Sequence, residues 1–345
     1  MSQRPLSAFL GFSKSYNTAL FCIFAFPFFL FSLWQAIDCL VSNGLRNGNI
    51  IPGEMYWFRQ GRGRLGIFIH LATVLPFSML SVPQFSPALR RKWPAFHRIN
   101  GRISLVLFFV SSIGALMIAD ISFGGAFDIQ VMVVILTAVS TISAALAYYN
   151  AYRLQLDAHR AWILRTMFYS GVILTARPVI LLSAVFISKL GTYQNIWPCE
   201  MIDWTWKAYG AGDYLPSYPE CASPNATTTI VTADLFSEYD PAARGASFQI
   251  PGSASFMLAL IWHAVGVEIY LARTQNEANR LRIQSERRQR AAGYANLGSV
   301  DKIAGMEPQT DPKLEDSSKE AGAGGEDEGV RRRARLAGRE TGTVE

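Results

Sequence analysis

The sequence predicts an all-α fold: a polytopic membrane bundle of about six transmembrane helices, with both termini in the cytosol and one long lumenal loop. Two observations predict it. Half of the 345 residues are hydrophobic and only 17% are charged, and the apolar residues lie in separate runs of roughly 18 to 25 residues, each long enough to cross a bilayer as a helix. Basic residues gather between alternate runs, which is typical of cytosolic loops.

The elements follow in order along the chain. Residues 1–16 form the predicted cytosolic N-terminus, and the first apolar run is longer than a signal-peptide core and lacks a small-residue cleavage pattern, which predicts an anchor that is retained. Residues 273–345 form a predicted cytosolic tail, helical at its start and disordered afterwards, because its later composition is poor in aromatic residues. The membrane domain covers 17–272, with spans at 17–41, 65–85, 103–119, 129–149, 166–188 and 253–272.

Charge placement predicts the orientation. Arginines and lysines crowd the loops after the second and fourth spans and the start of the tail, which predicts that these lie in the cytosol, although four arginines in the first loop favour the reverse. Residues 191–252 then form the lumenal loop. It carries an N-glycosylation acceptor at Asn225, and Cys199 and Cys221 can pair there as a disulfide. The endoplasmic reticulum and the plasma membrane both fit this pattern.

The net charge of +6 does not indicate nucleic acid. The basic residues lie at the ends of apolar runs and in the tail, where they set topology. The expected partners are therefore membrane lipid and a lipophilic small molecule. No phosphate-binding loop, serine-hydrolase elbow, zinc-protease motif or metal-spaced cysteine set is present, so neither a metal nor a cofactor is expected from motifs.

Arg177 lies in the middle of the fifth span. An ionised side chain at that depth is destabilising unless it is paired, and it marks a functional site by default. Glu268 in the sixth span is the expected partner, with His263 near the same depth as Arg177. The alternative is an ion pair that only holds the fifth and sixth spans together.

Four histidines allow a second hypothesis. His97 and His159 open spans at the cytosolic face, and His70 and His263 lie deeper. Two pairs at two depths are what a haem b bundle needs, with neutral imidazoles as axial ligands. The alternative is that His97 and His159 belong to basic clusters that bind phosphate headgroups.

Acidic residues gather at the predicted lumenal ends of the spans, among aromatic residues. A carboxylic acid in a partly apolar pocket holds its proton at neutral pH and can protonate an epoxide or alkene, while aromatic faces stabilise the resulting cation. We expect Asp120, Asp128 and Glu268 to be catalytic. The alternative is the ordinary interfacial belt of membrane proteins. The other residues of this expected pocket are Asp38, Glu54, His70, Trp34, Tyr56, Trp57 and Phe123, with Arg177 and His263 shaping the cavity.

The ordered motifs resemble a known family. His97-Arg-x-x-Gly-Arg102 follows the basic run after Pro83-Gln84-Phe85, His159-Arg-x-Trp-x-x-Arg165 follows the fourth span, and Ala176-Arg177 and Trp262 with Glu268 come later. Together they resemble the widespread predicted-membrane-protein family of unknown function, in a fungal-type member, from about Leu65 to Tyr270. Ser104 departs from the aromatic residue expected after the first motif.

The resemblance implies a link to secondary metabolism, because fungal members of such families often accompany secondary-metabolite genes. Small polytopic proteins there act as cyclases of prenylated substrates. The leading hypothesis is therefore a membrane enzyme, of the terpene-cyclase type, that cyclises or isomerises a lipophilic, prenylated or terpenoid substrate without a cofactor. The alternatives are a haem b electron-transfer protein of the cytochrome b561 type and a non-catalytic transporter or scaffold.

Overall fold

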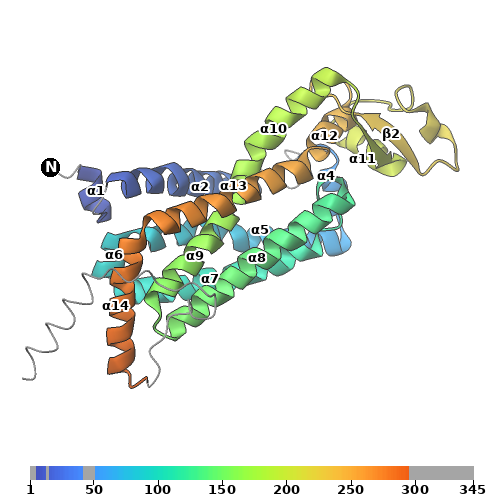
Figure 1. The fold of residues 1–345 in the computed structure, drawn as a ribbon. Helices are drawn as coiled ribbons and strands as arrows, with labels where there is room; N and C mark the ends of the chain where they lie inside the picture. The colour runs from blue at the N-terminus through green and yellow to red at the C-terminus, as the bar shows by residue number, and fades with distance from the viewer. Residues whose placement is uncertain (1–4, 13–14, 42–50, 295–345) are drawn as a thin grey trace, which may run out of the picture. The chain divides into compact units, whose positions relative to one another are not determined.

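The computed structural model describes residues 5–12, 15–41 and 51–294, which are mainly helical (Figure 1). The chain divides into two compact units, Met1–Ser285 and Glu286–Glu345. The predicted disordered tail, from residue 295 on, lies outside the described residues. The long helices are α2 (Ser15–Val41), α5 (Gly61–Ser81), α7 (Pro94–Met117), α8 (Phe127–Tyr152), α9 (Leu156–Ser170), α10 (Val172–Leu190) and α13 (Gly252–Arg273). The shorter helices are α1 (Pro5–Leu10), α4 (Glu54–Phe58), η1 (Val82–Phe85), α6 (Pro87–Lys92), η2 (Ser122–Gly125), α11 (Cys199–Ala208), η3 (Pro219–Ala222), α12 (Pro241–Gln249) and α14 (Gln275–Ala291).

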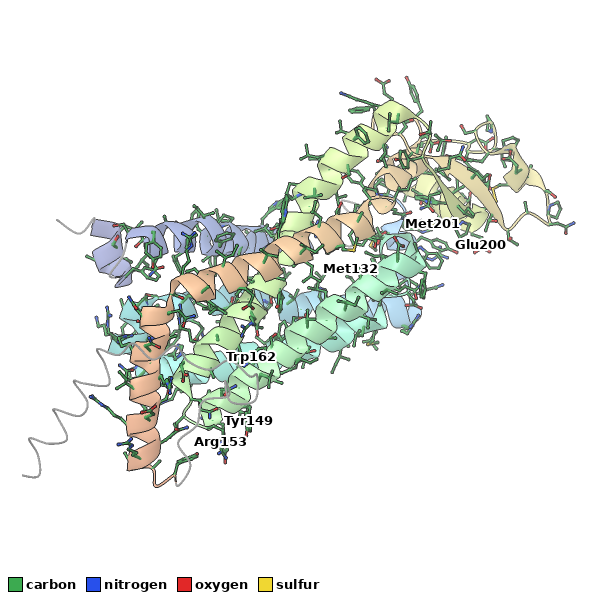
Figure 2. All side chains as sticks on the ribbon, viewed as in Figure 1. Met132, Tyr149, Arg153, Trp162, Glu200 and Met201 are labelled. Carbon is green, nitrogen blue, oxygen red and sulfur yellow. A yellow bond between two sulfur atoms is a disulfide. The ribbon has the colours of Figure 1, made fainter. Side chains whose placement is uncertain are left out.

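Six stretches of the described chain are long and apolar enough to cross a membrane: Ser15–Cys39, Gly61–Phe85, Pro94–Met117, Phe127–Tyr152, Leu156–Leu190 and Pro241–Arg273. This confirms the predicted helical membrane fold. The orientation stays a prediction, so we name the two sides by their residues. The loop side carries residues 191–252, including Glu200 and Met201, and the tail side carries the start of α14, Arg153 and Trp162 (Figure 2).

Several helices begin earlier than the apolar runs predict. α7 begins at Pro94, which suits a first helical position because proline has no backbone N–H to leave unpaired. α9 begins at Leu156 and leads into α10 through a kink at Gly171. The His97 and His159 motifs therefore lie in the first turns of helices on the tail side, ahead of the apolar runs that begin at 103 and 166.

The helices pack through small residues and aromatic clusters. α5 and α7 form the most extensive helix pair, and a Cβ added at Gly114 of α7 would lie only 2.6 Å from the backbone nitrogen of His70 and 2.8 Å from the carbonyl oxygen of Gly66. Such close backbone contact is common between membrane helices. A second cluster joins α8, α10 and α13, and it includes Ile129, Met132, Val172, Ala176, Ile180, Phe256 and Ala259.

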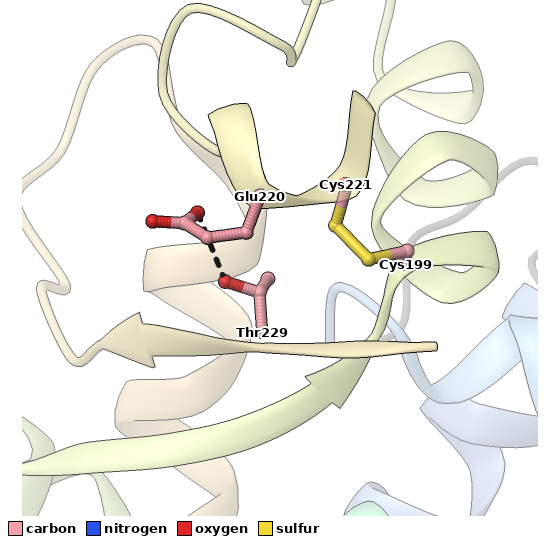
Figure 3. The surroundings of a disulfide bond; sticks show 4 residues. All are labelled: Cys199, Glu220, Cys221 and Thr229. Atoms are coloured by element: carbon pink, nitrogen blue, oxygen red, sulfur yellow. Dashed lines mark hydrogen bonds between the residues drawn. A yellow bond between two sulfur atoms is a disulfide. The ribbon is translucent and has the colours of Figure 1, made fainter. Parts of the chain in front are cut away.

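The loop between α10 and α13 folds around its own core. β1 (Gln194–Pro198) pairs antiparallel with β2 (Thr228–Thr232), with Ile196 opposite Ile230. Cys199 at the start of α11 and Cys221 in η3 form a disulfide, beside the hydrogen bond from Thr229 to Glu220 (Figure 3). The core residues are Ile187, Trp197, Met201, Ile202, Trp206, Tyr218, Val231, Ala233, Ala242 and Ala246.

Candidate functional site

A buried carboxyl group, that of Glu54, lies where the folded loop meets the helix ends on the loop side. The preceding residue, Gly53, has a φ of 90°, and a Cβ there would lie 2.5 Å from the side chains of both Trp197 and Met201. Only glycine allows this turn to lie so close to the loop core. The close approach places Glu54, only 4% exposed, at the start of α4 and beneath the turn η2.

Three hydrogen-bond donors hold the Glu54 carboxyl group. The turn η2 has positive φ at Phe123 (50°) and Gly124 (82°), so successive backbone N–H groups face the same way and form an anion-binding concavity. The backbone nitrogen of Phe123 donates to Oε2 at 3.2 Å, and that of Gly124 also donates. The Gln249 amide donates to Oε1 at 3.3 Å. A left-handed phenylalanine is uncommon and indicates that the surrounding structure imposes this turn.

Burial and hydrogen bonding act on Glu54 in opposite directions. Removal from water raises the pKa of the carboxyl group from its usual 4.5 to about 7, although the donors from Phe123, Gln249 and Gly124 each lower it. Burial disfavours the charged form and donated hydrogen bonds favour it. Near neutral pH the group therefore exists as comparable amounts of acid and carboxylate, which suits proton transfer.

A small pocket of about 60 Å³ lies next to this carboxyl group. Asp128, Asn195, Gln249 and Ser253 contribute its polar lining, and Phe123 part of its apolar lining. The Asn195 amide donates to Oε1 of Gln249 at 3.1 Å. Gln249 thus lines the pocket and bonds to Glu54, so it lies between the two. The pocket has room for a few waters or for one end of a larger molecule.

Of the three expected catalytic acids, only Asp128 lines this pocket. Asp120 forms an exposed ion pair with Arg62. Glu268 pairs with Arg165 on the tail-side half of α13, about 22 Å along the helix from Ser253 at 1.5 Å per residue. The expected joint action of Asp120, Asp128 and Glu268 is therefore not supported by their positions.

The expected pair of Arg177 and Glu268 is wrong. Arg165 binds Glu268 with two hydrogen bonds, 2.7 Å from Nε to Oε1 and 2.9 Å from Nη2 to Oε2. Arg165 lies on α9 at the depth of Glu268, whereas Arg177 lies on α10 beyond the kink. Arg165 on α9 therefore takes the place that Arg177 was expected to hold beside Glu268.

His263 and His70 are each held by a neighbouring helix. The Nε2 atom of His263, in a buried side chain, lies 2.7 Å from the Thr175 hydroxyl on α10. The Nδ1 atom of His70 lies 3.1 Å from the carbonyl oxygen of Ser111 on α7. Neither lines the pocket of Asp128, and Trp34 is 65% exposed on α2. Asp38, near the end of α2, is also outside the pocket lining.

The tail-side histidines have similar surroundings. Nδ1 of His159 lies 2.8 Å from the carbonyl oxygen of Ala147, and His97 lies within electrostatic range of His159 and Arg90. When Nδ1 donates to a carbonyl group, Nε2 is left to bind a metal or haem iron. No group of three or more metal-binding side chains occurs among the residues that the structure describes.

Glu54 belongs to the pocket expected from the sequence, but it is not one of the three expected catalytic acids. A local signal exists, because the acid follows Pro52-Gly53 and precedes Tyr56-Trp57, so it begins a helix among aromatic residues. Its decisive partner, Gln249, is 195 residues away in the chain. No local pattern predicts that contact.

Fold and site together define a helical integral membrane protein with a buried acid beside a small pocket on one side. Residues 67–199 match the family model described as a predicted membrane protein, DUF2306. The match begins within α5 and ends at the first disulfide cysteine, and it confirms the predicted resemblance to this family. The chain is also similar to the Ava biosynthesis cluster protein G of Aspergillus versicolor, at 25% identity over 76% of this chain and 90% of the relative. No solved structure matches.

Proposed function

We propose that the chain is a membrane enzyme of fungal secondary metabolism that isomerises or cyclises a lipophilic, prenylated or terpenoid substrate by acid catalysis. The observation that carries the proposal is the Glu54 carboxyl group, with a pKa of about 7, beside the pocket that Asp128 lines. The relative named for a biosynthesis cluster supports the metabolic setting. Two carboxyl groups in different environments divide acid and base roles between them.

The proposed chemistry needs one rotation. Gln249 separates Glu54 from the pocket, and its hydrogen bonds, at 3.1 and 3.3 Å, are long. Rotation of Gln249 brings the Glu54 proton to an alkene or epoxide at the end of the substrate. Phe123 and Phe256, whose ring centroids are 5.4 Å apart, stabilise the cation.

The Asp128 carboxylate then removes a proton from a neighbouring carbon, and a double bond forms there. The proton taken by Asp128 leaves to water and Glu54 regains one, so no oxidant or reductant is consumed. Phe127, at the start of α8 beside Asp128, is 79% exposed. The apolar tail of the substrate therefore has a hydrophobic surface next to the pocket.

Complementation of a gene deletion in the host strain tests this proposal. Substrate and product of an isomerisation or cyclisation have equal mass, so chromatography with mass detection should show one lipophilic metabolite replaced by an isomer of different retention time. We expect Glu54→Gln and Asp128→Asn to behave like the deletion. Glu238→Gln, which changes an exposed acid of the 191–252 loop, should restore the product. Normal product with both site variants would refute the proposed chemistry.

A haem b protein is the second candidate, favoured by one observation. His70 and His159 both place Nδ1 against a backbone carbonyl oxygen, which leaves Nε2 of each imidazole available as an axial ligand. Haem at these positions would supply electron transfer across the bundle. An absorption spectrum of the purified protein tests it: a Soret band that His159→Ala removes would support this candidate, and a spectrum without that band would exclude it.

A further inference from the structure

Arg177 is exposed on α10 and does not face His263 of α13. On α10, Thr175 faces His263 of α13, and Arg177 is about 200° further around the helix. Arg177 is exposed in the structure, and Leu181, on the same face one turn later, is 50% exposed. In a bilayer this face of α10 meets lipid and α2, so the guanidinium lies at hydrocarbon depth.

The guanidinium of Arg177 has an aromatic contact but no counter-ion among the described residues. It lies over the ring of Phe31 in α2, 5.0 Å from the centroid. Within residues 5–12, 15–41 and 51–294, no carboxylate forms an ion pair with Arg177. Arginines inside membranes are almost always paired. A cation–π contact stabilises the charge without neutralising it.

We propose that Arg177 and Phe31 bind the carboxylate of a lipophilic acid dissolved in the membrane. The planar guanidinium matches a carboxylate with two parallel hydrogen bonds. At 1.5 Å per residue, Arg177 lies about 20 Å from the loop-side end of α10 at Leu190. This position is deeper in the membrane than the headgroups of phospholipids. A single-chain acid enters this depth in its neutral form, and its proton leaves to water at the membrane surface when the carboxylate pairs with the guanidinium.

The surfaces beside Arg177 suit a hydrocarbon chain. On α10, Leu181 lies on the face of Arg177 and is 50% exposed, and on α2 Trp34, three residues after Phe31, is 65% exposed. These side chains extend from Arg177 and Phe31 toward the loop side. A lipophilic acid bound at Arg177 thus covers exposed apolar surface with its tail, while the charge pair is kept from water.

Binding of radiolabelled oleate to the purified full chain in lipid nanodiscs tests this site. We expect saturable binding of one oleate per chain, weakened about tenfold or more in Arg177→Gln, because one charge-assisted pair is lost. Phe31→Leu should weaken binding a few-fold, and Arg177→Lys should retain part of the affinity. The matched control is Lys189→Gln, a cation at the end of the same helix, which should bind like the wild type. Oleyl alcohol, which lacks the charge, should not compete.

Three outcomes would overturn the assignment: no saturable binding by the wild type, equal affinity in Arg177→Gln, or a dimer in light scattering that Arg177→Gln dissociates. The last would show that a second copy neutralises the charge. Circular dichroism and a single symmetric elution peak verify that each variant is folded. Asp128→Asn should bind oleate normally, so failure of the proposed chemistry and failure of this site are distinguishable.

Discussion

Glu54→Gln should remove a pH dependence of stability that Glu54 confers. The folded protein holds the carboxyl proton with a pKa of about 7, against the usual 4.5 expected for the unfolded chain. Between these two values the folded state binds a proton that the unfolded state does not, so stability falls as pH rises. The stabilisation is complete below pH 4.5 and is lost by about pH 7. The difference between the folded and unfolded pKa values corresponds to about 3 kcal/mol of unfolding free energy.

Thermal unfolding of the detergent-solubilised protein, followed by tryptophan fluorescence, measures this effect. Trp197 and Trp206 lie in the loop core near Glu54 and report on its unfolding. We expect the difference in stability between wild type and Glu54→Gln to change by about 3 kcal/mol between pH 4.5 and pH 7.5, with the wild type losing more as pH rises. Glu238→Gln serves as the control and should follow the wild type.

The comparison isolates one group because the other titrating groups are common to both proteins. A glutamine at position 54 still accepts the N–H of Phe123, so the turn η2 keeps a partner. If the stability of Glu54→Gln fell with pH as steeply as that of the wild type, Glu54 would not be the group that holds the proton. The proposed acid would then be refuted together with the pH dependence.

Three further predictions concern stability and topology. Cys199→Ser should lower the stability of the loop by about 3 kcal/mol in thermal unfolding, because the disulfide with Cys221 closes a segment with a sequence separation of 22. Reductant should lower the stability of the wild type by the same amount as the substitution, and it should not change the stability of Cys199→Ser. Gly114→Ala should lower the melting temperature and the folded yield, since a Cβ there meets backbone atoms, whereas Gly101→Ala should be tolerated because its nearest contact would be at 3.6 Å. Asn225→Gln should abolish an electrophoretic shift on glycosidase treatment; a wild type without that shift would contradict the lumenal assignment of the loop.

The membrane spans were predictable because hydropathy acts locally. Each crossing must bury about 20 apolar residues in sequence, and the six runs gave six crossing stretches. Helix starts were less predictable. Polar residues such as His97 and Arg102 lower the local hydropathy of α7, but they do not prevent helix formation, and Pro94 begins the helix before them. Hydropathy thus reports where a helix enters lipid and not where the helix begins.

The candidate site was predictable only in part. The sequence indicated acids among aromatic residues on one side, and Glu54 and Asp128 are there. It did not distinguish a buried acid from an acid such as Asp120 that pairs with a nearby arginine. That distinction depends on the turn at Phe123 and on Gln249, which come from segments that meet only in the folded chain.

The Arg177 pairing failed for a reason that applies to other membrane helices. Position along a helix indicates the depth of a side chain in the membrane but not the direction in which it points. The face of the helix matters as much: Thr175 meets α13, so Arg177, about 200° around α10, faces away from it. Arg165 satisfies both conditions, because it lies at the depth of Glu268 and points to it. Among the described residues no carboxylate pairs with Arg177, and the proposed lipophilic-acid site starts from that observation.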